Sequence, residues 1–234
     1  GELGKWYKPL LVFEAAYLFR DVDHMYKVVR GPIGKELSDG LLKATGMRIL
    51  DVWYYGTRHV TTSNRPVRTP QDMKGLKLRA PDMPMSIANA KAMGANPTPM
   101  AFAEVYLALQ QGVVEGQENP IATIATMKFN EVQKYLIMTG HVVQATPVVI
   151  SDAVYQRLPK EYQKILTEVI MKHTDSVKKM IVDAEKKYLV MFKEKGMTII
   201  DPDVDAFREA AKSLVPQFEN TWGKGLYERI QAVK

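Results

Sequence analysis

The feature that most constrains the fold is a very long helical pattern in the second half of the chain. It opens at Leu158-Pro159 and ends at Gly196, with apolar residues recurring along one side. At 1.5 Å per residue such a helix would be about 50 Å long, which is longer than one small domain. The apolar positions follow a 3.6-residue period and are interrupted by Lys172 and His173, so a coiled coil is the weaker alternative. The 234 residues allow one large domain or two small ones.

Strand and helix patterns alternate through the first 150 residues. Short apolar or aromatic runs at 10–13 and 47–56 are typical of strands, and 22–42 is helical in pattern with a break near Gly31-Pro32. This alternation predicts an α/β fold with a mostly parallel sheet and helices on both faces. The apolar, β-branched segment 135–150 is long enough to cross from one domain to another.

The stretch GLKLRAP (75–81) draws attention to one arginine. Its apolar residues alternate with Lys77 and Arg79, as in a strand with one face on a core. Pro81 cannot donate to a strand ladder, so the strand should stop there. Arg79 therefore lies near the carboxyl end of a strand, where ligands bind in α/β proteins. A surface ion pair is the alternative interpretation, because most arginines are solvated.

Two proline signatures predict helix starts. Thr98-Pro99 combines a capping hydroxyl with proline at the first helical position, and Asn119-Pro120 is a similar signature for a helix to about Tyr135. After the first signature, apolar residues follow at helical spacing: Phe102, Val105, Tyr106 and Leu109. The pattern alone does not decide whether Phe102 packs in the core or faces a ligand cleft. It also does not decide whether Asn119 caps a helix or contacts a ligand.

Composition narrows the classes of function. The net charge of +6 is spread along the chain, and its densest cluster alternates with acidic residues, as on a solvated helix face. No aromatic and basic interleaving accompanies it, so we expect no nucleic-acid partner. The absence of cysteine excludes thiolate nucleophiles, disulfides and Cys-type zinc sites. No run of about 18 apolar residues occurs, so no segment is expected to span a membrane.

Enzyme motifs are absent from the sequence. The four histidines are far apart, and no HExxH, GxSxG, Walker or GxGxxG pattern occurs. Glu115 and Glu118 flank a turn and could form an acid/base pair, but no nucleophile or oxyanion element accompanies them. Turn and cap roles are the simpler interpretation. We therefore expect a binding protein without catalytic residues, cofactor or metal.

Several motifs together carry a family resemblance. They are GTRHVTTSNRPV, DMKGLKLRAP, MGANPTPMAFAEVYLALQQGVVEGQENP, KFNEVQKYL and LPKEYQKIL. In order and spacing they resemble the DctP family, the extracytoplasmic solute-binding proteins of tripartite ATP-independent periplasmic (TRAP) transporters. The resemblance covers essentially all of residues 17–234, and the block from Gly94 to Pro120 is its most specific part.

The resemblance implies an architecture of two α/β lobes joined by crossing strands and a long helix. A first lobe would take residues 1–55 and 145–184, and a second lobe 56–144 and 185–234. The family usually begins with about 60 to 80 further residues of alternating strands and helices, so we expect the first lobe to lack its N-terminal part. Ala16 in FEAAYLF stands where the family usually carries proline, which predicts a different loop near the hinge.

The resemblance also implies a set of ligand-binding residues. Arg79 matches the arginine that anchors the ligand carboxylate, and Arg58 matches the arginine of the G-T-R motif. Asp82 stands where closely similar sialic-acid binders carry asparagine, which disfavours sialic acid because a carboxylate repels an anionic ligand. The complete set is Arg79, Arg58, Asn119, Phe102, Glu118 and Asp82.

The implied function is capture of a small organic acid in an interlobe cleft, followed by delivery to a membrane permease. C4-dicarboxylates, sialic acids, uronates and other carboxylates all remain open as ligands. We expect a periplasmic monomer whose partners are its ligand and the TRAP permease. The alternative is a small-molecule isomerase or lyase that uses Glu118 as a base.

Overall fold

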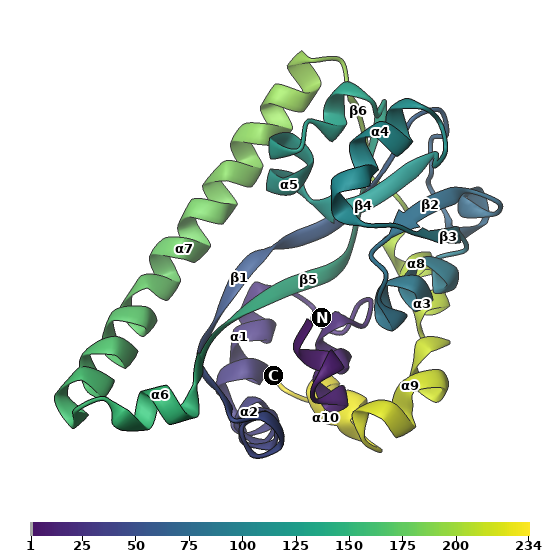
Figure 1. The fold of residues 1–234 in the computed structure, drawn as a ribbon. Coiled ribbons are helices and arrows are strands. Elements are labelled where there is room, and N and C mark those ends of the chain that lie inside the picture. The colour runs from purple at the N-terminus through teal and green to yellow at the C-terminus, as the bar shows by residue number, and fades with distance from the viewer. Residues whose placement is uncertain (1) are drawn as a thin grey trace.

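The predicted long helix is confirmed. The computed structural model describes residues 2–234, so Gly1, at the start of the predicted first lobe, lies outside it. Helix α7 spans Lys160–Glu194, 35 residues, and it runs along one side of the whole molecule (Figure 1). Its buried side chains are those of Gln163, Thr174 and Phe192. The helix thus packs at both ends of the molecule.

A six-stranded sheet forms the centre of the fold, in the order β3-β2-β4-β1-β5-β6. The strands are β1 (Met47–Thr62), β2 (Lys77–Ala80), β3 (Asn96–Pro99), β4 (Gly116–Pro120), β5 (Tyr135–Ser151) and β6 (Thr198–Ile200). The outer pairs are parallel, but β1 is antiparallel to both β4 and β5. The prediction of a mostly parallel sheet therefore fails at the centre.

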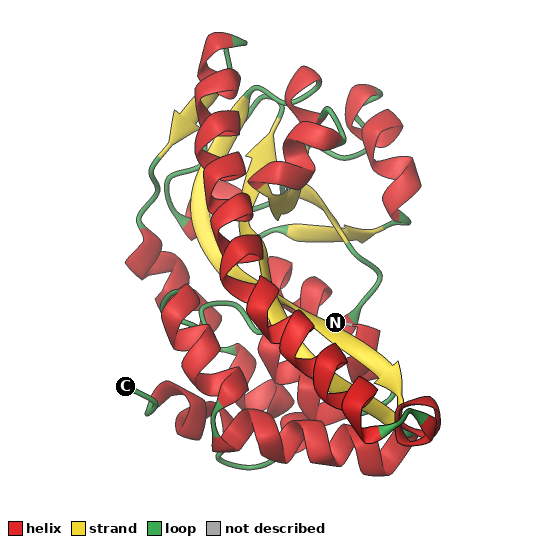
Figure 2. Ribbon diagram, turned by 90° about the vertical axis from the view of Figure 1, so that its left-hand side faces the viewer, coloured by secondary structure: helices red, strands yellow, loops and turns green. Residues whose placement is uncertain are grey.

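The long strands β1 and β5 cross the molecule as a curved antiparallel ribbon (Figures 1 and 2). Their register runs from Met47 opposite Ser151 to Thr62 opposite Tyr135, with three shifts along the way. One shift lies between Tyr54 and Gly56. Bulges bend and twist a strand pair, so the curved ribbon can extend through both ends of the molecule. The predicted crossing segment at 135–150 corresponds to β5.

Helices surround the sheet (Figure 2). The remaining α-helices are α1 (Val22–Arg30), α2 (Pro32–Thr45), α3 (Pro84–Ala92), α4 (Val105–Gln110), α5 (Ile121–Thr126), α6 (Asp152–Arg157), α8 (Val204–Ala211), α9 (Leu214–Trp222) and α10 (Leu226–Gln231). The 3-10 helices are η1 (Glu2–Lys5), η2 (Lys8–Glu14), η3 (Pro70–Met73), η4 (Phe102–Glu104) and η5 (Phe129–Glu131). Within residues 2–234, none of the helices is long and apolar enough to cross a membrane.

Several local predictions are wrong for identifiable reasons. The apolar run 10–13 lies in η2, which has proline in its first turn, where proline favours helix over strand. Residues 96–99 form the edge strand β3, because residues that precede proline prefer extended backbone and an edge strand tolerates proline. The second predicted helix starts at Ile121 and stops at Thr126.

Two groups of buried apolar residues hold the fold together. The larger includes Met25, Leu78 and Trp222 and joins η2, α1–α3, the sheet and the C-terminal helices. The smaller, with Val105 and Phe129 among its residues, lies between α4, α5 and the end of α7. The lobe boundaries remain a prediction, because the larger group joins residues from both predicted lobes.

Candidate functional site

Strand β4 carries the centre of the candidate site. All five of its residues, Gly116–Pro120, are buried, because β4 lies between β1 and β2. Asn119 belongs to this strand, and its Nδ2 donates to Gln117 Oε1 at 2.6 Å. The helix-cap interpretation of Asn119 is therefore wrong, since the following helix begins at Ile121. Polar side chains on a fully buried strand must find partners inside the protein.

Arg58 and Glu118 form a buried ion pair with two hydrogen bonds. Arg58 Nε lies 2.5 Å from Glu118 Oε2, and Arg58 Nη2 lies 2.8 Å from Oε1. Arg58 also donates to Gln144 Oε1 at 2.7 Å and to Asn119 Oδ1 at 3.1 Å. This fork geometry is the strongest form of arginine–carboxylate contact. The guanidinium of Arg58 is thus already occupied by the protein.

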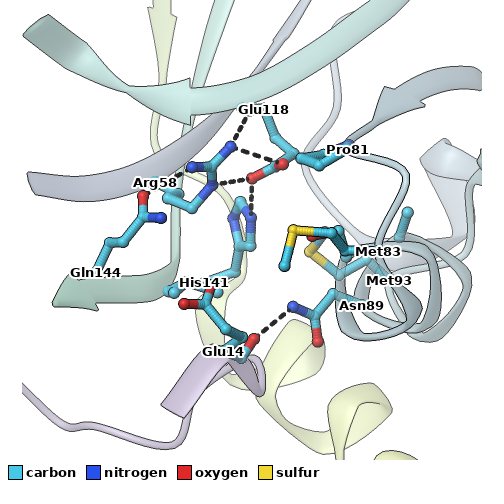
Figure 3. Close-up of a pocket in the computed structure, with 12 residues that line it drawn as sticks. Glu14, Arg58, Pro81, Met83, Asn89, Met93, Glu118, His141 and Gln144 are labelled. Carbon is cyan, nitrogen blue, oxygen red and sulfur yellow. Dashed lines mark hydrogen bonds and ion pairs between the residues drawn. The ribbon is translucent and has the colours of Figure 1, made fainter. Parts of the chain in front are cut away.

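His141 on β5 completes this network. Its Nε2 lies 3.0 Å from Glu118 Oε2, and its Nδ1 lies 2.8 Å from the Thr139 hydroxyl. Figure 3 shows the Glu118 carboxylate held between the Arg58 guanidinium and the His141 ring. No sequence motif points to His141 as a site residue. Its only signal was a polar residue inside a long apolar strand pattern.

The proximity of Arg58 and Glu118 to each other keeps both side chains ionised. Burial alone would raise the pKa of Glu118, but Arg58 and His141 lower it to about 2. Burial would lower the pKa of Arg58, but the Glu118 carboxylate raises it above its ordinary value. Both groups are therefore ionised near neutral pH. A carboxylate with so low a pKa is a weak base.

Arg79 lies on β2 next to this network. The apolar residues of its stretch, Leu76, Leu78 and Ala80, are fully buried, and Arg79 itself is only 3% exposed. Its Nε and Nη2 donate to the Met100 carbonyl oxygen at 3.2 and 2.8 Å. In residues 2–234 we find no carboxylate within ion-pair distance of Arg79. The surface ion-pair interpretation is therefore wrong. Burial lowers the pKa of Arg79.

Phe102 lies outside the hydrophobic core. Its side chain is 42% exposed, whereas Val105 and Leu109 are buried. The ring meets Phe129 edge to face at 6.2 Å between centroids, and the Arg79 guanidinium carbon lies 5.7 Å from its centroid. Core packing is thus the wrong interpretation of Phe102. Its contact with a ligand remains a prediction.

A cavity of about 60 Å³ lies beside the Arg58–Glu118 pair. Arg58 and Glu118 line it, whereas Arg79, Phe102, Asn119 and Asp82 do not. Asp82 is exposed. Several of the lining residues come from distant segments and are not marked by any sequence motif. The full lining is Glu14, Arg58, Pro81, Met83, Ser86, Asn89, Ala90, Met93, Glu118, His141, Val142 and Gln144 (Figure 3).

Metal binding has no evident site in the part of the chain that the structure describes. No group of three or more His, Cys, Asp or Glu side chains there is arranged to hold an ion. Glu118 and His141 share the cavity, but Arg58 competes for the same carboxylate. The arrangement is suited to binding through hydrogen bonds and charge.

Comparison with known families places the whole chain in one group. The family model described as "Bacterial extracellular solute-binding protein, family 7" (DctP) matches residues 1–221. The sialic acid-binding periplasmic protein SiaP of Vibrio cholerae is 39% identical over 233 residues, which cover 100% of this chain and 72% of that protein. Both matches extend over the strands and helices that form the site.

Solved structures agree with the fold. A TRAP periplasmic solute-binding protein from Roseobacter denitrificans, with bound 3-deoxy-D-manno-oct-2-ulosonic acid, superposes with a TM-score of 0.94 at 33% identity. The match covers 100% of this chain and 78% of that chain. A similar protein from Sulfurospirillum deleyianum, with bound succinate, gives a TM-score of 0.89 at 32% identity and covers 100% and 77%.

Proposed function

The chain belongs to family 7 of the bacterial extracellular solute-binding proteins, the DctP family, and we propose that it captures a small organic acid for a TRAP transporter. The ligand would bind beside β2 and β4, and the loaded protein would deliver it to the membrane permease. We propose that the protein acts in the periplasm as a monomer. The similar proteins with bound acids support this proposal.

The main support for this proposal is that Arg79 is buried without a carboxylate partner in the described residues. It is almost fully buried, yet its only hydrogen-bond acceptor in the described residues is the Met100 carbonyl oxygen. A buried cation without an anionic partner is costly, and a ligand carboxylate would remove that cost. Guanidinium and carboxylate groups can meet through two parallel hydrogen bonds, which fix orientation as well as charge. Arg79 is therefore the proposed anchor for the ligand.

Ligand capture would act through closure of two lobes. We propose lobes of residues 1–55 with 145–184, and 56–144 with 185–234, as the resemblance implies. The bulged ribbon of β1 and β5 connects both ends of the molecule, and a bulged strand pair is a place where bending can occur. A ligand that contacts both lobes favours the closed state by its differential affinity for it.

The lowered pKa of Glu118 argues against the enzyme alternative, in which Glu118 would act as a base. A general base works best with a pKa near the operating pH, whereas the pKa of Glu118 is lowered to about 2. Both oxygens of its carboxylate are engaged, by Arg58 and His141. We therefore assign Glu118 a role in positioning Arg58.

A ligand screen with a test for turnover separates these functions. We expect one or more organic acids to raise the unfolding temperature in a concentration-dependent way, because a ligand that binds only the folded state stabilises it. Proton NMR of the same mixtures should show the acid unchanged after long incubation. Conversion of the acid would support the isomerase or lyase alternative. Failure of every acid to stabilise the chain would contradict the proposed function.

A further inference from the structure

We infer that the side-chain amide of Asn89 is a latch that holds helix α3 against residues 14–16 and favours the closed arrangement of the two proposed lobes. This inference rests on the proposed function and concerns how the same protein opens and closes. It follows from two hydrogen bonds, from the backbone that receives them and from the elements that they join.

Asn89 makes both hydrogen bonds with the backbone of residues 14–16. Its Nδ2 donates to the Glu14 carbonyl oxygen at 2.8 Å, and its Oδ1 accepts from the Ala16 N–H at 3.0 Å. Figure 3 shows the contact between Asn89 and Glu14. The Asn89 residue is only 6% exposed. A buried amide that is satisfied in this way contributes stability only while the two segments stay together.

The latch joins segments that belong to different proposed lobes. Residues 14–16 follow η2 in the first proposed lobe, whereas Asn89 lies on α3 in the second. Glu14 and Asn89 both line the cavity beside the Arg58–Glu118 pair. Of the described residues that line it, Glu14 alone belongs to the first proposed lobe. Movement of one lobe away from the other would therefore separate Asn89 from its two backbone partners.

The backbone that receives the latch is held in place by β5. The Tyr17 N–H donates to the His141 carbonyl oxygen at 2.7 Å, and the Tyr17 hydroxyl donates to the Thr139 carbonyl oxygen at 3.0 Å. Tyr17 has a φ of +59°, a left-handed conformation that a bulky residue keeps only where its surroundings hold it. The neighbouring Ala16 N–H is therefore fixed in direction. The latch would open by movement of α3.

The strength of the two hydrogen bonds suits reversible opening. Each intramolecular hydrogen bond adds only a modest net stability, because the separated groups bond to water instead. The much stronger Arg58–Glu118 ion pair lies within the second proposed lobe, so it is not broken when the lobes separate. Asn89 therefore biases the closed arrangement without locking it, and a ligand can shift that balance.

Thiol labelling measures opening without a ligand. The chain has no cysteine, so Ala90→Cys introduces a single thiol on α3, at a cavity-lining position that is 1% exposed. Iodoacetamide can reach this thiol when α3 separates from residues 14–16. Addition of Asn89→Ala should speed the labelling at least about tenfold, equivalent to about 1.4 kcal/mol, because two hydrogen bonds are lost.

Two controls separate opening of the latch from a general loss of stability. Ala108→Cys places a thiol at a 7% exposed position of α4, in the smaller core group. Its labelling should change by less than about twofold when Asn89→Ala is added, because local opening at α3 leaves that core intact. Asn96→Ala, at an exposed position of β3, should leave the labelling of Ala90→Cys within about twofold.

A variant that removes one of the two bonds tests the latch as a pair of partners. Ala16→Pro deletes the N–H that donates to Asn89 and keeps the Glu14 carbonyl oxygen. Ala15 has φ −67° and ψ 134°, a backbone conformation that suits the residue before proline. Ala16→Pro should speed the labelling of Ala90→Cys about threefold or more. In the presence of Asn89→Ala it should add less than about 1.5-fold, because that bond is already lost.

Release of bound acid connects the latch to the proposed function. Succinate and 3-deoxy-D-manno-oct-2-ulosonic acid, which are bound in the similar proteins, serve as probes in stopped-flow displacement. An acid that binds should leave the Asn89→Ala protein at least about fivefold faster than the parent protein, because opening from the closed arrangement is easier.

The possible failures are distinguishable. Labelling of Ala90→Cys that stays within about twofold after Asn89→Ala would overturn the latch, as would fully additive effects of Asn89→Ala and Ala16→Pro. Unchanged release of an acid that binds would overturn it as well. If neither acid bound, the wider ligand screen would decide the proposed function, and thiol labelling would still decide the latch.

Discussion

The hydroxyl of Tyr54 on β1 donates to the Glu185 carboxylate on α7, with 3.1 Å between the oxygen atoms. The same carboxylate accepts from the backbone N–H of Thr57 at 3.3 Å. These residues flank Gly56, where the register of β1 and β5 shifts. The long helix is thus fastened to the ribbon at the bulge, where the proposed closure would bend.

Replacement of Glu185 should change how stability depends on pH. Burial raises the pKa of Glu185 above its ordinary value, so the folded protein binds this proton more tightly than the unfolded chain. The free energy of unfolding should therefore fall as pH rises through the interval between the ordinary and the raised pKa. Glu185→Gln removes this slope while keeping an acceptor for Tyr54. Denaturant titrations between pH 4 and 8 measure it, and parallel curves for both proteins would contradict the assignment.

Because Glu118 forms a buried ion pair with Arg58, replacing Glu118 should strongly lower the free energy of unfolding. Glu118→Gln should lower the free energy of unfolding by about 3 kcal/mol or more, because it leaves the Arg58 cation buried without its anion. The folded pKa of Glu118 is lowered to about 2, from 4.5. Its contribution to stability is therefore complete above pH 4.5 and is lost as the pH falls through about 2.

Urea titrations over this acid range should show a steeper loss of stability in the parent protein than in Glu118→Gln. Glu168→Gln, on the exposed side of α7, is the matched control and should change stability by less than about 0.5 kcal/mol at neutral pH. Equal stability of Glu118→Gln and the parent protein would show that the ion pair adds nothing net.

Gly56 permits the close approach of β1 to β4. Its φ is +134°, and a Cβ atom there would lie 2.7 Å from the Cβ of Pro120. Gly75 also has a positive φ, of +78°, but a Cβ there would meet open space. Gly56→Ala should therefore destabilise the protein by at least about 1 kcal/mol more than Gly75→Ala, because overpacking adds to backbone strain. Chemical denaturation of both variants measures the difference, and equal losses would show that β4 moves aside freely.

Sequence patterns predicted the elements whose structure is decided locally. Helix α7 has an apolar 3.6-residue period that is interrupted only near its middle, and β2 has a regular alternation that ends at Pro81, so both were predictable. The strand β3 was not, because Thr98-Pro99 also suits a helix start and only its pairing with β2 decides the outcome. Local propensity is a weak guide where tertiary pairing competes with it.

The candidate site was predictable only in part. Arg58 and Glu118 were selected through the family motifs, and the structure brings them into direct contact. Glu14 and Gln144 lie far from them in the sequence, in segments without a polar motif, and the fold alone brings them to the cavity. No local pattern reports that Arg58 is neutralised and Arg79 is not. That difference depends on which strands are neighbours.

The central prediction concerns Arg79 and requires three variants. Arg79→Ala should weaken binding of the cognate acid by about 2–5 kcal/mol, roughly 30-fold to several thousand-fold, because it removes one partner of a desolvated charge pair. Arg79→Lys should recover only part of the affinity, since a point charge cannot reproduce the fork. Arg157→Ala, on the exposed surface of α6, is the control and should bind as the parent protein does.

The fold should survive these changes at Arg79, so that affinity can be measured. The strand is held to the core by Leu76, Leu78 and Ala80, which are fully buried. Arg79→Ala loses two hydrogen bonds to the Met100 carbonyl oxygen, which should cost about 1–3 kcal/mol of stability. Calorimetric titration of each variant, beside urea unfolding without ligand, separates the two effects. If Arg79→Ala bound the acid within about twofold of the parent protein, Arg79 would be a structural arginine that supports the Met100 turn, and the carboxylate anchor would have to lie elsewhere.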